Sequence, residues 1–374
     1  MANILSLVWY KILPASFGGQ KGIARFSHYL GMHHKLYCLC SRNNQASGDE
    51  SFKVINELPE SKWQFIDPTI YHKIRSVIHD HKITHLVLEH CYHGFHGIRL
   101  ARKLNLKLLV HSHNIEYQRF REMKKWWWPL LYLLEKRTHR AADLSLFKTE
   151  TDQSIAIRQF GLDAGKCMIV PYGIERNAEA EFEEKQQCRQ ELETRHGINK
   201  DTRIILFNGT LDYEPNALAL KHIVNHIIPA LEKKTKLPFM VLVTGRIIYK
   251  EFDYLLKLHH PRYLNAGYVK DVDTYFKGAD IFINPLIQGG GVKVKLVEAL
   301  SFGLPVISYV SGAHGMDITL TGNKLSIIED GNTEAFADAL IGNWNNTEKL
   351  PPEFFSRYSW KAIAAEVAER IEQL

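Results

Sequence analysis

The stretch that decides the fold is NPLIQGGGVKVKLVEALSFGLPV, residues 284–306. It starts where the apolar run DIFINPL (280–286) ends, passes through three glycines and two lysines, and continues with apolar residues at helical spacing. An apolar run, a glycine-rich loop and an amphipathic segment, in that order, predict a strand, a loop and a helix, the unit of parallel α/β sheets. We expect the helix over 292–302, ended by Gly303.

The loop between this strand and this helix suits an anion. It holds three consecutive glycines without side chains to keep an anion away from the backbone amides: Gly289, Gly290 and Gly291. Those amides and the positive end of the helix dipole attract negative charge, and Lys293 and Lys295 add two cations. Glu298 follows one turn later, and its side chain leans back toward the loop. A tight turn followed by a surface Glu298–Lys295 ion pair would give the same pattern.

Short apolar runs alternate with longer helical patterns along the rest of the chain, which is typical of βαβ units. We expect two consecutive doubly wound α/β domains. The predicted division is an N-terminal domain over 1–172, a linker with a solvated helix over 173–200, and a C-terminal domain over 201–355, with a last helix over 356–374 that packs back on the first domain. The expected strands are 3–9, 35–40, 85–89, 106–111, 144–148, 167–170, 203–209, 239–245, 263–269, 280–286, 305–310 and 324–329.

Composition limits the class of protein. A chain of 374 residues with 47 Lys+Arg and 41 Asp+Glu has a net charge of +6, which suits a phosphate-bearing small molecule or an anionic membrane and is too small to indicate nucleic acid. Five scattered cysteines without further ligands at metal-site spacing indicate core thiols and a reducing compartment. The start reads as a strand rather than a signal peptide, and no run reaches the ~20 apolar residues of a membrane span. We therefore expect a cytoplasmic protein.

The decisive stretch resembles the C-terminal signature of the GT-B-fold glycosyltransferases of family 4, also called glycosyl transferases group 1. The matching features are Pro285, the triglycine, Lys293, Lys295, Glu298 with Ala299, and the G-x-P-V of residues 303–306. Other segments match in the expected order: FNGTLDYEPN (207–216), VLVTG (241–245), AGYVKDVDTYFKGADIFINP (266–285), SFGGQKG (16–22), HSHNIEYQRF (111–120), KTETD (148–152) and IVPYGIE (169–175). The resemblance spans nearly the whole chain.

The resemblance implies two Rossmann-like domains that face a central cleft, the second binding a nucleotide sugar and the first an acceptor. In the second domain Glu298 would bind the ribose, the backbone at Tyr268 and Val269 would edge the base, and the glycines with Lys293 and Lys295 would hold the diphosphate. Transfer would retain the anomeric configuration and need no metal or other cofactor, because the cations and helix dipole neutralise the leaving diphosphate. The family's usual acid eight residues before Glu298 is Gly290 here, and the usual cation pair after residue 209 is absent, which leaves Arg246 as a further phosphate contact.

The N-terminal half supplies further site residues. Gly18 and Gly19 follow the first strand and match the loop that meets the donor diphosphate from the opposite side, although a simple strand-to-helix turn would look similar. His111 and His113 end a strand on one face. The resemblance favours His113 as a hydrogen-bond donor to the donor sugar or as a proton shuttle; a structural histidine pair is the alternative. EHCYHGFHG (89–97) is read as acceptor-pocket lining or as ordinary structure rather than a zinc site.

The run MKKWWWPLLYLLEKR (123–137) sets three tryptophans beside lysines. Such composition is typical of segments at a membrane interface, and we expect contact with a membrane or a lipid-linked acceptor through 123–134. A buried amphipathic helix, a dimer contact or an aromatic platform for a sugar would give a similar run.

The reading that unites these features is a retaining, metal-independent, hexosyltransferase-like enzyme. It would move a sugar from a nucleotide diphosphate to a glycan or lipid-linked acceptor in cell-surface polysaccharide or glycoconjugate synthesis, at the inner face of the membrane. A sugar-nucleotide epimerase of the same fold, or a protein that binds sugar nucleotides or carbohydrate without catalysis, remains as an alternative. An NAD-dependent dehydrogenase is disfavoured, because no G-x-G-x-x-G follows the first strand.

Overall fold

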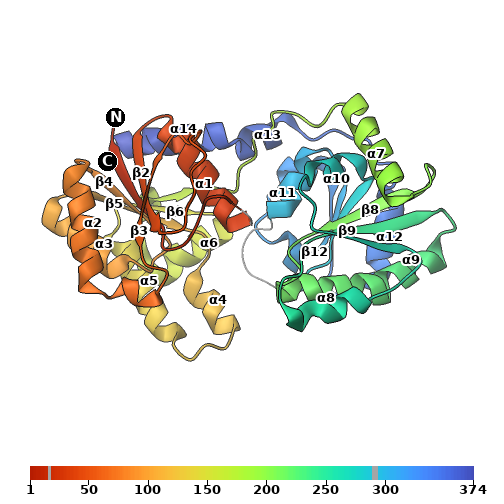
Figure 1. The fold of residues 1–374 in the computed structure, drawn as a ribbon, viewed down its shortest axis with the longest axis horizontal. Helices are drawn as coiled ribbons and strands as arrows, with labels where there is room; N and C mark the ends of the chain where they lie inside the picture. Colours follow the sequence, from red (N-terminus) through yellow and green to blue (C-terminus); the bar gives the residue numbers. More distant parts are fainter. Residues whose placement is uncertain (16–17, 289–293) are drawn as a thin grey trace. The chain divides into compact units, whose positions relative to one another are not determined.

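A computed structural model describes residues 1–15, 18–288 and 294–374 (Figure 1). The chain divides into two compact units. The first unit comprises Met1–Glu175 with Tyr358–Leu374, and the second comprises Arg176–Arg357. Each is a parallel α/β sheet with covering helices, which confirms the predicted fold class.

The first unit is built on a seven-stranded parallel sheet in the order β3-β2-β1-β4-β5-β6-β7. Six strands coincide with predicted apolar runs. Strand β3 (KVINEL) escaped prediction because it is a half-exposed edge strand with polar side chains on half of its positions. The strands are β1 Asn3–Leu7, β2 Lys35–Ser41, β3 Lys53–Leu58, β4 His85–Glu89, β5 Lys107–Ser112, β6 Leu144–Phe147 and β7 Cys167–Ile169.

Helices cover the first sheet, and helices α2 and α3 bury their apolar residues against β1, β4 and β5. The C-terminal helix α14 packs beside α1 (Figure 1). The helices of this unit are α1 Gly18–Gly31, α2 Pro68–Asp80, α3 Gly94–Leu104, α4 Glu116–Glu122, α5 Trp128–Ala141, α6 Glu150–Ala156 and α14 Trp360–Glu372, with short turns η1 Lys62–Phe65, η2 Ile157–Gly161 and η3 Ala164–Lys166.

The second unit is built on a six-stranded parallel sheet in the order β10-β9-β8-β11-β12-β13. All six predicted strands are present: β8 Arg203–Asn208, β9 Phe239–Thr244, β10 Tyr263–Gly267, β11 Ile281–Asn284, β12 Val306–Tyr309 and β13 Leu325–Ile328. Its helices are α7 Phe182–His196, α8 Glu214–His222, α9 Ile228–Lys234, α10 Asp273–Gly278, α11 Val294–Ser301, α12 Thr333–Asn343 and α13 Pro352–Tyr358, of which the last residue falls in the first unit. Short turns are η4 Ile223–Ile227, η5 Lys250–Lys257, η6 Ser311–Ala313, η7 Ile318–Leu320 and η8 Gly322–Lys324.

The segment predicted as a linker with a solvated helix over 173–200 contains helix α7. Helix α7 within it packs against α10 of the second unit, and Arg189 of α7 binds Asp280 at 2.6 Å. The helix buries only Leu192 of its side chains, which explains why its sequence reads as a solvated helix.

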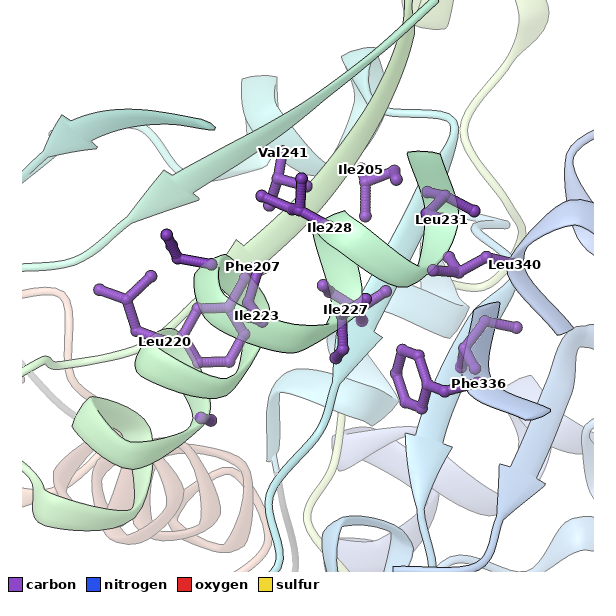
Figure 2. Close-up of a cluster of buried hydrophobic side chains, with 14 of the residues drawn as sticks. Ile205, Phe207, Leu220, Ile223, Ile227, Ile228, Leu231, Val241, Phe336 and Leu340 are labelled. Atoms are coloured by element: carbon purple, nitrogen blue, oxygen red, sulfur yellow. The ribbon is translucent and has the colours of Figure 1, made fainter. Parts of the chain in front are cut away.

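The core of the second unit forms where β8 and β9 meet the helices that follow them. Figure 2 shows side chains from both strands packed on one continuous helical stretch and on α12: Ile205, Phe207, Val241, Leu220, Ile223, Ile227, Ile228, Leu231, Phe336 and Leu340. Each large apolar side chain buried here contributes roughly 1.5–3 kcal/mol. This core holds the carboxyl ends of the strands in place for the site described next.

The stretch that opened the sequence analysis folds largely as predicted. Helix α11 is Val294–Ser301, and Gly303 takes the left-handed conformation at φ +80° just beyond its end. A Cβ at Gly303 would meet only the ends of the flexible Glu179 and Lys185 side chains, so the position needs glycine for its left-handed conformation rather than for space. Among the helices of the described residues, none has both the length and the apolar character to cross a membrane.

Candidate active site

Each sheet has one place where the strand order reverses direction. In the second unit this switch point lies between β8 and β11, and in the first unit between β1 and β4. Ligands of open α/β sheets bind in the crevice beyond the carboxyl ends of the strands at such points. Each unit therefore has its own candidate ligand site at its switch point.

A hydrogen bond spans the switch point of the second unit. Lys295, in the first turn of α11 after β11, donates from Nζ to Oδ1 of Asn216 in α8 after β8, at 3.1 Å. The same ammonium lies 4.5 Å from the ring centre of Phe207, at the end of β8. Lys295 is half-buried and Asn216 is buried. The side chain of Asn216 thus holds a cation in place at the carboxyl edge of the sheet.

Two glycines allow the strand ends to approach closely beside this cation. A Cβ at Gly209 would lie 2.7 Å from Nδ2 of Asn216, and a Cβ at Gly245 would lie 2.0 Å from the carbonyl oxygen of Gly209. Asn216 itself donates to the carbonyl of Thr210 at 2.8 Å. The loop after β8 is therefore held by the side chain of Asn216 and by the close backbone approach of Gly245 to Gly209.

The other predicted donor-site residues of the second unit lie along the same edge. Arg246 lies two residues after the end of β9, where its carbonyl accepts a hydrogen bond from the Leu211 amide at 3.0 Å. Tyr268 and Val269 follow β10; Tyr268 is 74 % exposed, beside Gly267 at φ +65°. An exposed ring beside a strand end offers a face on which a planar base can stack.

Glu298 lies one helical turn after Lys295 in α11 and is half-buried. Its carbonyl accepts the hydroxyl of Ser301 at 2.7 Å. Four further predicted residues lie outside the described residues: Gly289, Gly290, Gly291 and Lys293. Their assignment to the diphosphate stays a prediction, as do the roles of Lys295 and Glu298.

In the first unit, Gly18 and Gly19 form the first turn of α1, which follows β1 at the switch point. Gly19 is exposed and Gly18 is half-buried. On the other side of the switch point, β4 ends at Glu89, and Ser6 of β1 donates to Oε1 of Glu89 at 3.3 Å.

Glu89 is the centre of a chain of buried polar groups at the ends of β4, β5 and β6. Nε2 of His113 lies 2.6 Å from Oε2 of Glu89, and Nδ1 of His111 lies 2.9 Å from the same oxygen. Nζ of Lys148, just beyond β6, lies 2.8 Å from Nε2 of His111. The chain runs from the Lys148 ammonium through His111 and Glu89 to His113, and only His113 reaches the surface, with its side chain 11 % exposed.

Burial and charge set the protonation states along this chain. Burial alone would keep Glu89 protonated, but His111 and His113 outweigh it and hold the pKa of Glu89 well below its ordinary value. Burial holds the pKa of His113 well below its ordinary value, and His111 acts in the same direction. Burial also lowers the pKa of Lys148 to about 8. At neutral pH this series of buried side chains therefore consists of an ammonium at Lys148, a carboxylate at Glu89 and neutral imidazoles.

These states determine the tautomer of His113. An ionised carboxylate only accepts hydrogen bonds, so Nε2 of His113 carries the proton that is donated to Glu89. Nδ1 is then the ring nitrogen that carries the lone pair. His113 can therefore accept a hydrogen bond or a proton from a ligand hydroxyl at Nδ1, whereas the sequence predicted a hydrogen-bond donor or a proton shuttle at this position.

A second buried carboxylate lies beside this chain. Glu116, at the start of α4, contacts Nδ1 of His90 at 3.1 Å and accepts from the hydroxyl of Tyr92 at 2.8 Å. Burial opposes ionisation, but His90 outweighs it and lowers the pKa of Glu116 to about 2. Glu135 of α5 accepts the first two amides of α4 at 2.9 Å each, while burial raises the pKa of Glu135 to about 8.

Within the residues that the structure describes, one group could hold a metal ion: Glu89, His111 and His113, whose ligand atoms lie within 4.8 Å of one another. The Lys148 ammonium beside His111 opposes a further cation there. His90, His93 and His96 turn to different partners: His90 contacts Glu116 and His96 contacts the Gln64 carbonyl. Independence from metal stays a prediction.

Three residues of these sites were not assigned a role from the sequence: Glu89, Lys148 and Asn216. Glu89 and Lys148 are charged residues that close apolar strand runs, HLVLE and LSLFK. A charged residue at the carboxyl end of a buried strand indicates a residue near the ligand site, and this signal could have identified both. Asn216 lies in a segment that matches the family, but no spacing rule links it to Lys295.

The chain matches two models of protein families. Residues 18–177 match glycosyltransferase family 4, and residues 202–346 match glycosyl transferases group 1. No curated protein sequence matches the chain.

Solved structures with similar folds cover almost the entire chain. Sucrose-phosphate synthase from Thermosynechococcus elongatus is 14 % identical with a TM-score of 0.73, over 99 % of this chain and 98 % of its own. HepE of Anabaena in complex with UDP-glucose is 15 % identical with a TM-score of 0.73, over 100 % of both chains. WaaG, a glycosyltransferase involved in lipopolysaccharide biosynthesis, is 14 % identical with a TM-score of 0.67, over 98 % of this chain and 95 % of its own. Together the two family models cover most of the chain, and the chain belongs to the glycosyltransferases of family 4, group 1, with the GT-B fold.

Proposed function

We propose that this glycosyltransferase moves a sugar, with retention of configuration, from a nucleoside diphosphate to a glycan or lipid-linked acceptor of cell-surface polysaccharide or glycoconjugate synthesis. The observation that carries the proposal is the Lys295 ammonium, which Asn216 holds across the switch point of the second unit. The presence of UDP-glucose in the complex of HepE supports a sugar nucleotide as the donor.

The leaving diphosphate would be neutralised by the protein itself. Lys293, Lys295 and the positive end of helix α11 would bind its oxygens, with Gly289, Gly290 and Gly291 offering backbone amides and Arg246 a further cation. Glu298 would accept hydrogen bonds from the ribose hydroxyls, and Tyr268 and Val269 would edge the base. No metal would be required.

His113 of the first unit would hold the reacting sugar or its acceptor. Its Nδ1 lone pair would accept a hydroxyl proton or hydrogen bond, because Nε2–H is already donated to Glu89. Gly18 and Gly19 would let the donor diphosphate approach the start of α1. The acceptor oxygen would bond to the anomeric carbon on the face from which the diphosphate oxygen departs, which gives retention.

Binding of the donor can be tested by thermal shift against UDP-, GDP-, ADP- and dTDP-sugars, because a ligand that binds the folded state raises its stability. We expect one nucleotide class to raise the melting temperature and Lys295→Ala to abolish that rise. Lys233→Ala, at an exposed lysine of α9, is the control. We also expect Glu298→Ala and Lys295→Ala each to abolish turnover in a folded protein. Unchanged turnover in both variants would remove the site assignment, and conversion of the donor without an acceptor would indicate an epimerase.

We further propose that segment 123–134 contacts the inner face of an anionic membrane. Of its three tryptophans, Trp126 is 83 % exposed, while Trp127 and Trp128 are partly buried against neighbouring rings. The contact would therefore be made by Trp126 with Lys124 and Lys125, both exposed. Loss of vesicle binding in Trp126→Ala would support it, and unchanged binding would contradict it.

A further inference from the structure

A second surface of the first unit has a composition unlike the rest of the molecule. Helices α2, α3 and α5 line a groove with a volume of about 920 Å³. Five of its lining residues are exposed cations: Arg75, Arg99, Arg102, Lys103 and Arg137. No aspartate or glutamate lines it.

A smaller hollow of about 460 Å³ continues this surface along α5. It shares Arg102 and Arg137 with the groove, adds Lys136 and Arg140, and again has no acidic lining residue. We call these seven cations, with the apolar residues between them, the basic face. Among the described residues, no carboxylate forms an ion pair with any of the seven.

This separation of charge is unusual for the chain. The net charge of the entire protein is +6, whereas the basic face alone carries seven uncompensated cations. A hollow of similar size in the second unit, about 750 Å³, is lined by both signs, with Lys185 and Lys324 beside Glu179 and Asp280. Clustered like charges repel one another in the free protein, so the basic face favours an anionic partner.

Apolar side chains are exposed between the cations. Ile66 is 58 % exposed and Phe95 is 50 % exposed at the groove, and Leu133 is 61 % exposed at the smaller hollow. Leu130, Leu133 and Arg137 follow one another at helical spacing on the exposed side of α5. A soluble phosphate would be bound by the cations alone, but a bilayer offers anionic headgroups together with an apolar layer beneath them.

We propose that the basic face binds the surface of an anionic lipid bilayer. The cations would contact headgroup phosphates, and Ile66, Phe95 and Leu133 would enter the boundary between the headgroups and the acyl chains. This inference rests on the proposed membrane contact of 123–134 and extends that contact to the basic face. A membrane-bound protein held in this way would meet a lipid-linked substrate by diffusion in two dimensions.

The test measures binding of the full chain to vesicles of phosphatidylcholine with and without phosphatidylglycerol, by sedimentation. Each basic residue near an anionic surface contributes about fivefold in affinity. We expect the triple variant R102Q/K103Q/R137Q to bind the anionic vesicles about a hundredfold more weakly. The matched control is K233Q/K236Q/K257Q, which removes the same charge from exposed lysines of the second unit. We expect it to bind like the wild type, and melting temperatures check that both variants are folded.

A second pair of substitutions separates a bilayer from other polyanions. Ile66→Gln and Phe95→Gln keep all seven cations, and we expect both to weaken vesicle binding but not binding to heparin. Equal losses in the two triple variants, or wild-type binding in the first, would overturn the proposal. Vesicle binding that is unchanged in Ile66→Gln and Phe95→Gln would also overturn the proposal, because the basic face would then bind anions in general. Loss in Trp126→Ala alone would assign the membrane contact to 123–134, and all these outcomes are independent of sugar transfer.

Discussion

Replacing Glu89 by Gln measures how much the buried series of polar side chains around Glu89 stabilises the first unit. The substitution keeps the shape of the side chain but removes the carboxylate that contacts both His111 and His113. It also removes the charge that stabilises the protonated form of Lys148. We expect E89Q to lower the free energy of unfolding of the first unit by about 3–4 kcal/mol at pH 7.

Two contributions give this magnitude. The hydrogen bond from His113 to Glu89, at 2.6 Å, involves a charged acceptor and contributes about 1.5–3 kcal/mol. Without Glu89, Lys148 can escape the cost of a buried charge by losing its proton. Its pKa is about 8, so deprotonation at pH 7 costs about 1.4 kcal/mol, one pKa unit.

The lysine contribution has a distinct pH dependence. Burial lowers the pKa of Lys148 to about 8 in the folded wild type, so above pH 8 the wild type also holds a neutral lysine. The part of the E89Q effect that depends on Lys148 should therefore fall from about 1.4 kcal/mol at pH 7 to near zero at pH 9. In a double-mutant cycle with Lys148→Met, the coupling between the two sites should show the same fall.

Urea unfolding followed by tryptophan fluorescence suits this experiment. Six of the seven tryptophans belong to the first unit, and only Trp344 belongs to the second. A cost below about 1 kcal/mol for E89Q would refute the reasoning, since it would mean that water replaces the carboxylate without loss. A coupling with Lys148 that stays constant between pH 7 and pH 9 would show that the ammonium is not compensated by Glu89.

Three further predictions concern packing and protonation. Gly245→Ala should destabilise the second unit by roughly 1–3 kcal/mol, because its Cβ would lie 2.0 Å from a backbone oxygen. Gly342→Ala lies in helix α12 with open space around it and should stabilise the unit by about 0.4–1 kcal/mol. Calorimetry compares the two variants. Burial lowers the pKa of His93 and of His139 to about 3, so the unfolded chain takes up protons first as the pH falls below about 6.5. Each histidine should then cost about 2 kcal/mol of stability at pH 5, and a first unit equally stable at pH 5 and pH 7 in urea titrations would contradict this. Burial raises the pKa of Glu135 to about 8, so its two oxygens accept the first two amides of α4 as an ionised carboxylate only above that pH. Glu135→Gln leaves one acceptor for the two amides and should cost about 1–3 kcal/mol in a urea titration at pH 9, and a neutral effect at pH 9 would show that water reaches the unpaired amide.

Much of the fold could be predicted because its signals are local. Buried parallel strands read as continuous apolar runs, and twelve such runs became strands within a few residues of their predicted limits. Strand β3 was missed because it is an edge strand with polar side chains on half of its positions. Helix α7 was read as part of a linker because it is attached to the second unit mainly through charged contacts such as Arg189 with Asp280, which leave no apolar stripe in the sequence.

The sites were predicted less completely because their contacts join distant segments. A motif with internal spacing, such as Lys295 and Glu298 on one helix, can be read from one segment. The contact of Lys295 with Asn216 joins residues 79 positions apart, and that of Lys148 with His111 joins residues 37 positions apart. Strand order alone brings these pairs together, and the order at a switch point is a property of the sheet rather than of any segment.

The central claim is that the switch point of the second unit binds the diphosphate of a nucleotide sugar. A crystal structure of the protein with a nucleoside diphosphate tests it most directly. We predict phosphate density beside Lys295 and the start of α11, with the ribose at Glu298. A nucleotide bound at another place, with this edge of the sheet empty, would contradict the claim.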